Sequence, residues 1–230
     1  MAEVVPFCGL RYNPKKVGDI SEVIAPPYDV INVDDRIQLQ EQNQYNTVHL
    51  ILNQPSDQDT EVSNQYTRAA EQMQLWINNS ILVQDPSPCY YVYDQSFSTP
   101  DGKAYTRRAL IAIGKLEEFN NRVVLPHEKT LAAPKLDRLN LMRRTHANLS
   151  PIFLLYSDLE GIVESEMKNY TSANSPLIDI PEKFGSTHRM WRIGNNKINN
   201  RIKAAFTSKT LLIADGHHRY ETSLAFRDEI

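Results

Sequence analysis

The sequence has little of what would place it in several common classes of protein. Its 230 residues contain only two cysteines, Cys8 and Cys89, which lie far apart and form no Cys-x-x-Cys pair. Such spacing indicates neither a disulfide framework nor a cysteine-based zinc site. No stretch approaches the roughly 18 consecutive apolar residues of a membrane span, and the start lacks the basic and then apolar pattern of a signal peptide. We therefore expect a cytoplasmic protein that does not insert into membranes.

A strong charge of either sign is also absent. The formal net charge is −3, with 41% hydrophobic and 23% charged residues, which are ordinary values for a folded globular chain. A nucleic-acid partner is not expected because no overall positive charge would attract phosphate backbones. The length suits one large α/β unit or two subdomains that share a cleft. The sequence does not specify an oligomeric state.

Apolar patterns with helical and strand periods alternate along the chain and predict an α/β fold, a mixed sheet with flanking helices. Pro100, Asp101 and Gly102 suit the loop of a hairpin, so antiparallel pairing is expected within the sheet. His49 falls in a predicted buried strand, where it is expected to pack. Predicted helices cover 32–42, 62–76, 135–147, 162–169, 198–206 and 217–227, and predicted strands cover 4–7, 47–52, 90–93, 105–116, 152–156, 190–193 and 210–214.

Near the end of the sequence, an apolar strand runs through Asp215 and Gly216 directly into a helix. Glycine allows the backbone to approach an anion closely, and the first N–H groups and the dipole of a helix favour negative charge. The side chains of His217, His218 and Arg219 add further donors, and an arginine can hold two phosphate oxygens. Gly216, His217, His218 and Arg219 are therefore predicted to bind the phosphate of a nucleotide.

Asp215 would repel a bare phosphate, so it requires another role. Its carboxylate is predicted to hold Mg²⁺ or to accept a proton from a hydroxyl nucleophile, and both roles belong to phosphoryl transfer. His218 is a second candidate for acid–base catalysis. In the alternative interpretation, Asp215 is an N-cap residue and the next three residues form a solvated first turn.

A second polar segment, Pro126-His127-Glu128-Lys129-Thr130, is followed by a predicted helix. His127 and Glu128 are candidates for acid–base catalysis because polar loops of this kind often carry function. Lys135 and Arg138 are three residues apart on the helix and are predicted to face an anion together. The alternative is a solvated loop followed by ordinary helix charges.

Tyr28 and Asp29 follow two prolines, which fix an extended backbone, and this stiff loop is a candidate substrate loop. An Asx turn is the structural alternative.

A metal site is a further possibility, because Glu221 follows His217 by four residues and His218 by three on one helix. Such a site needs a further ligand, and His127 or Glu128 would be brought to it by folding.

The motifs together resemble the family catalogued as domain of unknown function 1015, over nearly the whole chain. Members of that family run past the final helix, so the sequence is expected to be the N-terminal part of a longer protein. The motifs are Pro6-Phe7, Ala25-Pro26-Pro27-Tyr28-Asp29-Val30, Pro126-His127-Glu128 with Thr130, Asp137-Arg138-Leu139, Ala147-Asn148-Leu149-Ser150-Pro151-Ile152-Phe153 and Ala214-Asp215-Gly216-His217-His218-Arg219-Tyr220-Glu221.

The last motif also resembles the phosphate-binding box of the ParB and sulfiredoxin superfamily, which includes an archaeal free-serine kinase. This resemblance implies a ParB/sulfiredoxin-like element around the box, a catalytic or metal-associated role for Asp215 and phosphate contacts from the next four residues. Sulfiredoxin has a cysteine where His217 stands, so sulfinic-acid reduction by that route is not expected. The helix-turn-helix domain of ParB proteins is not found in this sequence.

The leading hypothesis is phosphoryl transfer from ATP or ADP, with Mg²⁺, to a small hydroxyl compound, and serine is the acceptor that the resemblance favours. The expected partners are therefore a nucleotide and a small-molecule substrate. One alternative is a non-catalytic module that switches on binding nucleotide, as ParB relatives do with CTP. The other is a metal-dependent hydrolase built on the histidines.

Overall fold

The computed structural model describes residues 1–128, 130 and 132–230 and divides the chain into two compact units. Each unit is assembled from three separate segments of the sequence. The segments of unit 1 are Met1–Leu10, Gln84–Val124 and Tyr156–Leu211, and those of unit 2 are Arg11–Val83, Leu125–Leu155 and Leu212–Ile230. Helices alternate with strands along the chain, which confirms the predicted α/β class.

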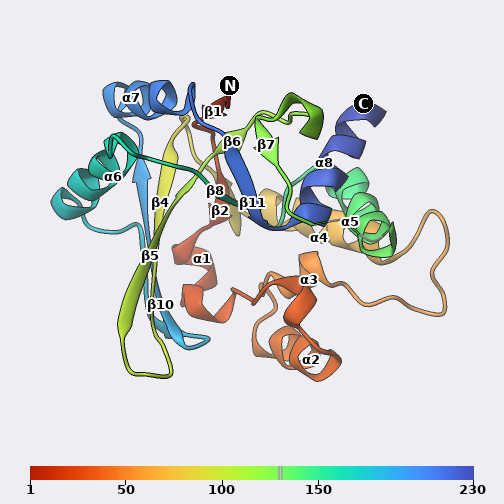
Figure 1. The fold of residues 1–230 in the computed structure, drawn as a ribbon. Helices are drawn as coiled ribbons and strands as arrows, with labels where there is room; N and C mark the ends of the chain where they lie inside the picture. Colours follow the sequence, from red (N-terminus) through yellow and green to blue (C-terminus); the bar gives the residue numbers. More distant parts are fainter. Residues whose placement is uncertain (129, 131) are drawn as a thin grey trace. The chain divides into compact units, whose positions relative to one another are not determined.

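Unit 1 contains a four-stranded antiparallel sheet with the order β5-β4-β10-β9. Figure 1 labels β4, β5 and β10 of this sheet. The strands are β4 Tyr90–Ser98, β5 Ala104–Ile111, β9 Ile178–Lys183 and β10 Ser186–Ile193. The predicted hairpin is confirmed, because β4 pairs with β5 and Gly102 adopts a φ of 80° in the loop between them. Strand β9 was not predicted. It contains Pro181, which is tolerated because β9 lies at the edge of the sheet.

The remaining elements of unit 1 are a short strand pair and two helices. Strand β1 Val4–Val5 pairs with β6 Ile113–Gly114, the 3₁₀ turn η3 spans Phe119–Asn121, and helix α6 Ile162–Ala173 contacts α7 Asn196–Phe206. Apolar side chains of the sheet and of these helices are buried. They include Tyr90, Val92, Val163, Met167, Ile193 and Ile202.

Unit 2 is mainly helical. Its helices are α1 Pro14–Val17, α2 Val33–Gln42, α3 Val48–Ile51, α4 Gln65–Asn78, α5 Ala132–Thr145 and α8 His217–Glu229, with 3₁₀ turns η1 Ile20–Glu22 and η2 Tyr28–Val30. Strand β2 Leu10–Tyr12 pairs with β3 Leu82–Gln84, and β11 Leu211–Asp215 lies between β7 Val124–Leu125 and β8 Phe153–Leu155. Trp76 is buried in a cluster with Val17, Val23, Leu50, Ile81 and Leu82. Helix α5 contacts both α4 and α8, and so connects this part of the fold to the C-terminal helix.

Asparagine side chains determine where the first long helices begin. Asn32 accepts a hydrogen bond from the backbone N–H of Asp35 and forms a capping box, which confirms the predicted start of α2. Asn64 accepts from two backbone N–H groups at the start of α4. Helix α4 therefore begins at Gln65, and Val62, which was predicted to lie in this helix, precedes it and is 81% exposed.

The strand predicted at 47–52 is wrong, because Val48–Ile51 form helix α3. Asn46, two residues before this helix, is completely buried, and its side chain donates to the carbonyl oxygens of Glu22 and Ile24. Its Oδ1 accepts from the backbone N–H of Val48 at 3.0 Å, which turns the chain where a strand would stay extended. His49 packs edge-on to Trp76, with ring centroids 6.4 Å apart, as a packed histidine would.

Candidate functional site

The chain passes from strand β11 into helix α8 at Gly216, in unit 2 (Figure 1). Gly216 is the N-cap residue of α8 and has φ 92° and ψ 31°, a left-handed conformation that disfavours residues with a Cβ. In the described part of the chain no side chain caps α8, whereas asparagines cap α2 and α4. Such a helix start offers backbone donors and a favourable dipole to an anion.

The guanidinium of Arg219 folds back onto the start of its own helix. It forms an ion pair with Asp215 and donates a hydrogen bond to the carbonyl oxygen of Pro151. A Cβ built on Gly216 would lie 2.9 Å from Nε and 3.0 Å from Cζ of Arg219. The side chain of Arg219 is 12% exposed and that of Asp215 is 63% exposed. The structure thus gathers Asp215, Gly216 and Arg219 at one end of α8.

His127 is tied to both β11 and α8. Its Nδ1 lies 2.7 Å from the carbonyl oxygen of Ile213, and because a carbonyl can only accept, Nδ1 carries a proton. Its backbone N–H donates to Nε2 of His217 at 3.3 Å, so this nitrogen keeps its lone pair and the proton of His217 is on Nδ1. The two rings are perpendicular, with centroids 4.4 Å apart. Neutral His127 therefore has its available lone pair on Nε2.

Glu128 lies beside the buried histidine. Its Oε1 is 2.9 Å from Nδ1 of His217, and the side chains are 51% and 1% exposed respectively. Among the described residues, Nδ1 makes no aligned hydrogen bond, because the carboxylate is close but off the direction of the ring N–H. One donor atom from each of His127, Glu128 and His217 lies within 4.8 Å of the other two. Folding therefore places His217 with the 127–128 segment.

Glu221, which was considered as a metal ligand, instead anchors two other polar residues. Its Oε2 accepts from Nζ of Lys135 at 2.7 Å and from Oγ1 of Thr130 at 2.6 Å. Burial raises the pKa of Glu221, but the hydrogen bonds from Lys135 and Thr130 outweigh this and hold it below the usual value for glutamate. The positive charge of Lys135 is thus already paired. Lys129, in the same polar segment, lies outside the described residues.

Arg138 connects the predicted substrate loop to helix α5. Its guanidinium lies 4.1 Å from the ring centroid of Tyr28 and donates to the carbonyl oxygen of Ile51 at 2.9 Å. It also pairs with Asp137 at 2.5 Å, and its side chain is only 10% exposed. Burial raises the pKa of Tyr28, against the opposing effect of the nearby Arg138 charge. Asp29, the other loop candidate, is exposed.

Apart from Tyr28, Asp29 and Arg138, the predicted site residues gather in three groups within unit 2. His218 is half-buried on α8 and lies within electrostatic reach of Glu221. Several of their partners carry no sequence signal, because the backbone carbonyl oxygens of Pro151 and Ile213 have no side-chain signature. The groups are Asp215, Gly216 and Arg219; His127, Glu128 and His217; and Thr130, Lys135 and Glu221.

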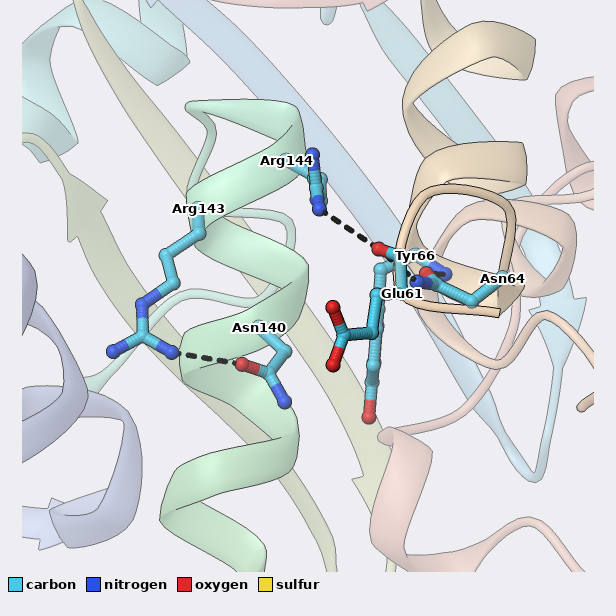
Figure 2. A pocket seen from close by; sticks show the side chains of 6 residues that line it. All are labelled: Glu61, Asn64, Tyr66, Asn140, Arg143 and Arg144. Atoms are coloured by element: carbon cyan, nitrogen blue, oxygen red, sulfur yellow. Dashed lines mark hydrogen bonds between the residues drawn. The ribbon is translucent and has the colours of Figure 1, made fainter. Parts of the chain in front are cut away.

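A separate open pocket of about 420 Å³ lies between the start of α4 and helix α5 (Figure 2). Its lining is polar: Arg144 donates to the carbonyl oxygen of Glu61 at 3.2 Å, and Arg143 donates to Oδ1 of Asn140 at 2.9 Å. Asn64 and Tyr66 complete the lining. The three groups above do not line this pocket, so its position does not support a role in the proposed phosphate chemistry.

These observations define an α/β protein with a polar site where a strand meets a helix. The chain belongs to the family described as "Protein of unknown function (DUF1015)", whose model matches residues 4–230. Comparison with curated proteins and with solved structures found no match. The likeness of the box to the ParB and sulfiredoxin superfamily therefore stays a prediction. No helix in the described part of the chain is long and apolar enough to cross a membrane.

Proposed function

We propose that unit 2 binds the phosphates of ATP or ADP at the start of α8 and, with Mg²⁺, transfers a phosphoryl group to a small hydroxyl compound. The observation that carries the proposal is the junction at Gly216, where a helix without a side-chain cap begins against the guanidinium of Arg219. Backbone N–H groups, a helix dipole and an arginine fork then act on the same anion.

The ion pair between Asp215 and Arg219 suggests why a metal–nucleotide complex is the preferred ligand. A phosphate that binds Arg219 competes with Asp215 for the guanidinium, and the carboxylate then loses its partner. Mg²⁺ carried by the nucleotide replaces that partner, since carboxylate oxygens are ligands that Mg²⁺ favours. Asp215, 63% exposed, is accessible for this exchange or for accepting the proton of the attacking hydroxyl.

The contacts in the structure make some of the other predicted roles less favourable than others. Lys135 and Arg138 are each paired with a carboxylate, so a phosphate contact from either requires that Glu221 or Asp137 give way. Arg219 is also paired with a carboxylate, but Mg²⁺ on the nucleotide can take its place at Asp215, so the start of α8 and Arg219 account for most of the proposed binding. His218 stays a candidate for acid–base catalysis, and Tyr28 and Asp29 for contact with the acceptor.

Serine is the first acceptor to test, because the box resembles that of the free-serine kinase. The full chain is incubated with Mg²⁺, serine and either ATP or ADP, and phosphoserine is measured by mass spectrometry. Phosphoserine in one of the two reactions is the expected result. Its absence from both contradicts the serine version, and tight nucleotide binding without any phosphorylated product from a panel of small hydroxyl compounds would favour a nucleotide-binding switch instead.

A further inference from the structure

The geometry points to a binding site for a divalent transition-metal ion formed by His127, Glu128 and His217. One donor atom from each residue lies within 4.8 Å of the others. Two ligands bound at about 2.1 Å from one ion can be at most about 4.2 Å apart, so any pair of donor atoms that is farther apart than this must move closer when the ion binds. Glu128 is 51% exposed, and its Oε1 already lies 2.9 Å from Nδ1 of His217.

The ring of His127 already has the arrangement of a metal ligand. Histidines that bind metals usually donate their other ring N–H to a carbonyl or carboxylate, which orients the ring and raises the basicity of the ligating nitrogen. Nδ1 of His127 lies 2.7 Å from the carbonyl oxygen of Ile213. Nε2 is consequently the nitrogen that is free to bind an ion.

His217 supplies the second observation. It is 1% exposed, and its Nδ1 has no aligned hydrogen-bond partner among the described residues although Glu128 is 2.9 Å away. A buried polar atom in this state is unusual. Once the ring proton has left Nδ1, a metal ion bound to both this nitrogen and the carboxylate of Glu128 would satisfy it. Binding through Nδ1 requires the ring proton to move to Nε2, so the long 3.3 Å hydrogen bond from the His127 backbone must be given up.

The ligand set indicates the class of ion. Two imidazole nitrogens and one carboxylate oxygen suit zinc and its first-row neighbours, whereas Mg²⁺ and Ca²⁺ prefer oxygen ligands throughout. Three protein ligands leave a coordination position for water or for an oxygen of a bound molecule. This assignment gives His127 and Glu128 a ligand role in place of the acid–base role predicted from the sequence.

Titration with Co²⁺ tests the site without nucleotide, so the result does not depend on the proposed phosphoryl transfer. The full chain is purified without a histidine tag, treated with a chelator and titrated while the visible absorption of bound Co²⁺ is recorded, with Zn²⁺ and Mg²⁺ as competitors. We expect one Co²⁺ per chain, displaced by Zn²⁺ but not by equimolar Mg²⁺. His127→Ala and Glu128→Gln are expected to weaken binding at least tenfold.

The matched controls are His188→Asn and Glu160→Gln, which lie in unit 1 and are expected to leave Co²⁺ affinity unchanged. Because His217 is buried and its replacement can unfold the chain, its role is followed by ¹⁵N NMR, where Zn²⁺ should move the proton from Nδ1 to Nε2. Equal Co²⁺ affinity in the parent chain and in a His127→Ala, Glu128→Gln double variant overturns the inference, as does an unchanged His217 tautomer at saturating Zn²⁺.

Discussion

The guanidinium of Arg219 occupies the space beside Gly216 in which a Cβ would stand, with Nε only 2.9 Å from that position. Gly216 is thus required for two separate reasons, its φ of 92° and the close approach of this side chain. A side chain at position 216 would strain the left-handed backbone and so lower the stability of the chain. It would also push Arg219 from its position and so disturb the proposed phosphate site.

Replacing Gly216 by alanine separates these two effects when Gly161→Ala is the reference. Gly161 is the N-cap residue of α6 with φ 64°, and an added Cβ there meets nothing within 4 Å. Both variants are expected to lose about 1–2 kcal/mol of unfolding free energy from the left-handed backbone. Only Gly216→Ala displaces Arg219, so only this variant should also bind nucleotide more weakly in calorimetry.

If Gly161→Ala and Gly216→Ala bind nucleotide with the same affinity as the parent chain, Arg219 does not need its position beside Gly216 to hold phosphate. Chemical denaturation of both variants confirms that each is folded before binding is measured.

Local sequence signals predicted the long helices and the β4–β5 hairpin, whereas long-range contacts determined the helix at 48–51. Asn32 and the turn at Gly102 act on their own neighbours, so the start of α2 and the hairpin could be read directly. The helix at 48–51 could not be predicted, because the Asn46 side chain that turns the chain at Val48 is held by carbonyl groups more than twenty residues away. An apolar run that short fits a strand and a helix equally well.

In the candidate site as well, contacts between sequence neighbours were predicted and contacts between distant residues were not. The order of strand, Asp215, Gly216 and helix is contiguous in the sequence, and the predicted junction is present in the structure. His127 and His217 are ninety residues apart, and their contact depends on a backbone N–H that any residue but proline would supply. Sequence spacing therefore suggested Glu221 as a partner for His217, although Glu221 binds Lys135.

The Lys135–Glu221 pair is expected to make stability depend on pH. The pKa of Glu221 is lowered in the folded chain, so its contribution is present above the unfolded value of about 4.3 and is lost as the pH falls through the lower folded value. Glu221→Gln should reduce the unfolding free energy by about 1 kcal/mol near pH 7, since the pair is partly exposed.

Urea denaturation of the parent chain and of Glu221→Gln across pH 7 to pH 3 measures this contribution. The difference between the two should shrink as the solution becomes more acidic. Glu160→Gln, a change at an exposed residue, is the control and should show a small difference that does not vary with pH. A difference that grows toward low pH would show that the lowered pKa is wrongly assigned.

The contact between Tyr28 and Arg138 allows the structural and substrate roles of the loop to be separated. Tyr28→Phe keeps the ring beneath the guanidinium, 4.1 Å away, and should leave stability nearly unchanged. Tyr28→Ala removes the cation–π contact and should cost about 0.5–2 kcal/mol. If the hydroxyl contacts the acceptor, Tyr28→Phe raises the KM for that acceptor while its denaturation midpoint stays at the parent value. An unchanged KM assigns Tyr28 to loop structure alone.

Substitution of Arg219 should impair nucleotide binding, whereas substitution of Asp215 should impair turnover. Arg219→Ala removes a charged hydrogen-bond donor, worth roughly 1.5–3 kcal/mol, and should weaken nucleotide binding about tenfold to a hundredfold. Folding should be retained, because Asp215 is 63% exposed and water can solvate it once its partner is gone. Arg189→Ala is the matched control, since it breaks an exposed arginine–aspartate pair with Asp179 in unit 1.

Asp215→Asn should instead retain metal-free nucleotide binding and abolish turnover, because an amide is neither a base nor a good ligand for Mg²⁺. In this variant no carboxylate competes with the phosphate for the guanidinium of Arg219. Metal-free nucleotide should therefore bind at least as tightly as it does to the parent chain. Calorimetry with and without Mg²⁺ measures both effects. An Asp215→Asn variant that binds Mg²⁺–nucleotide and turns it over like the parent would show that the ion pair only holds the start of α8 in place.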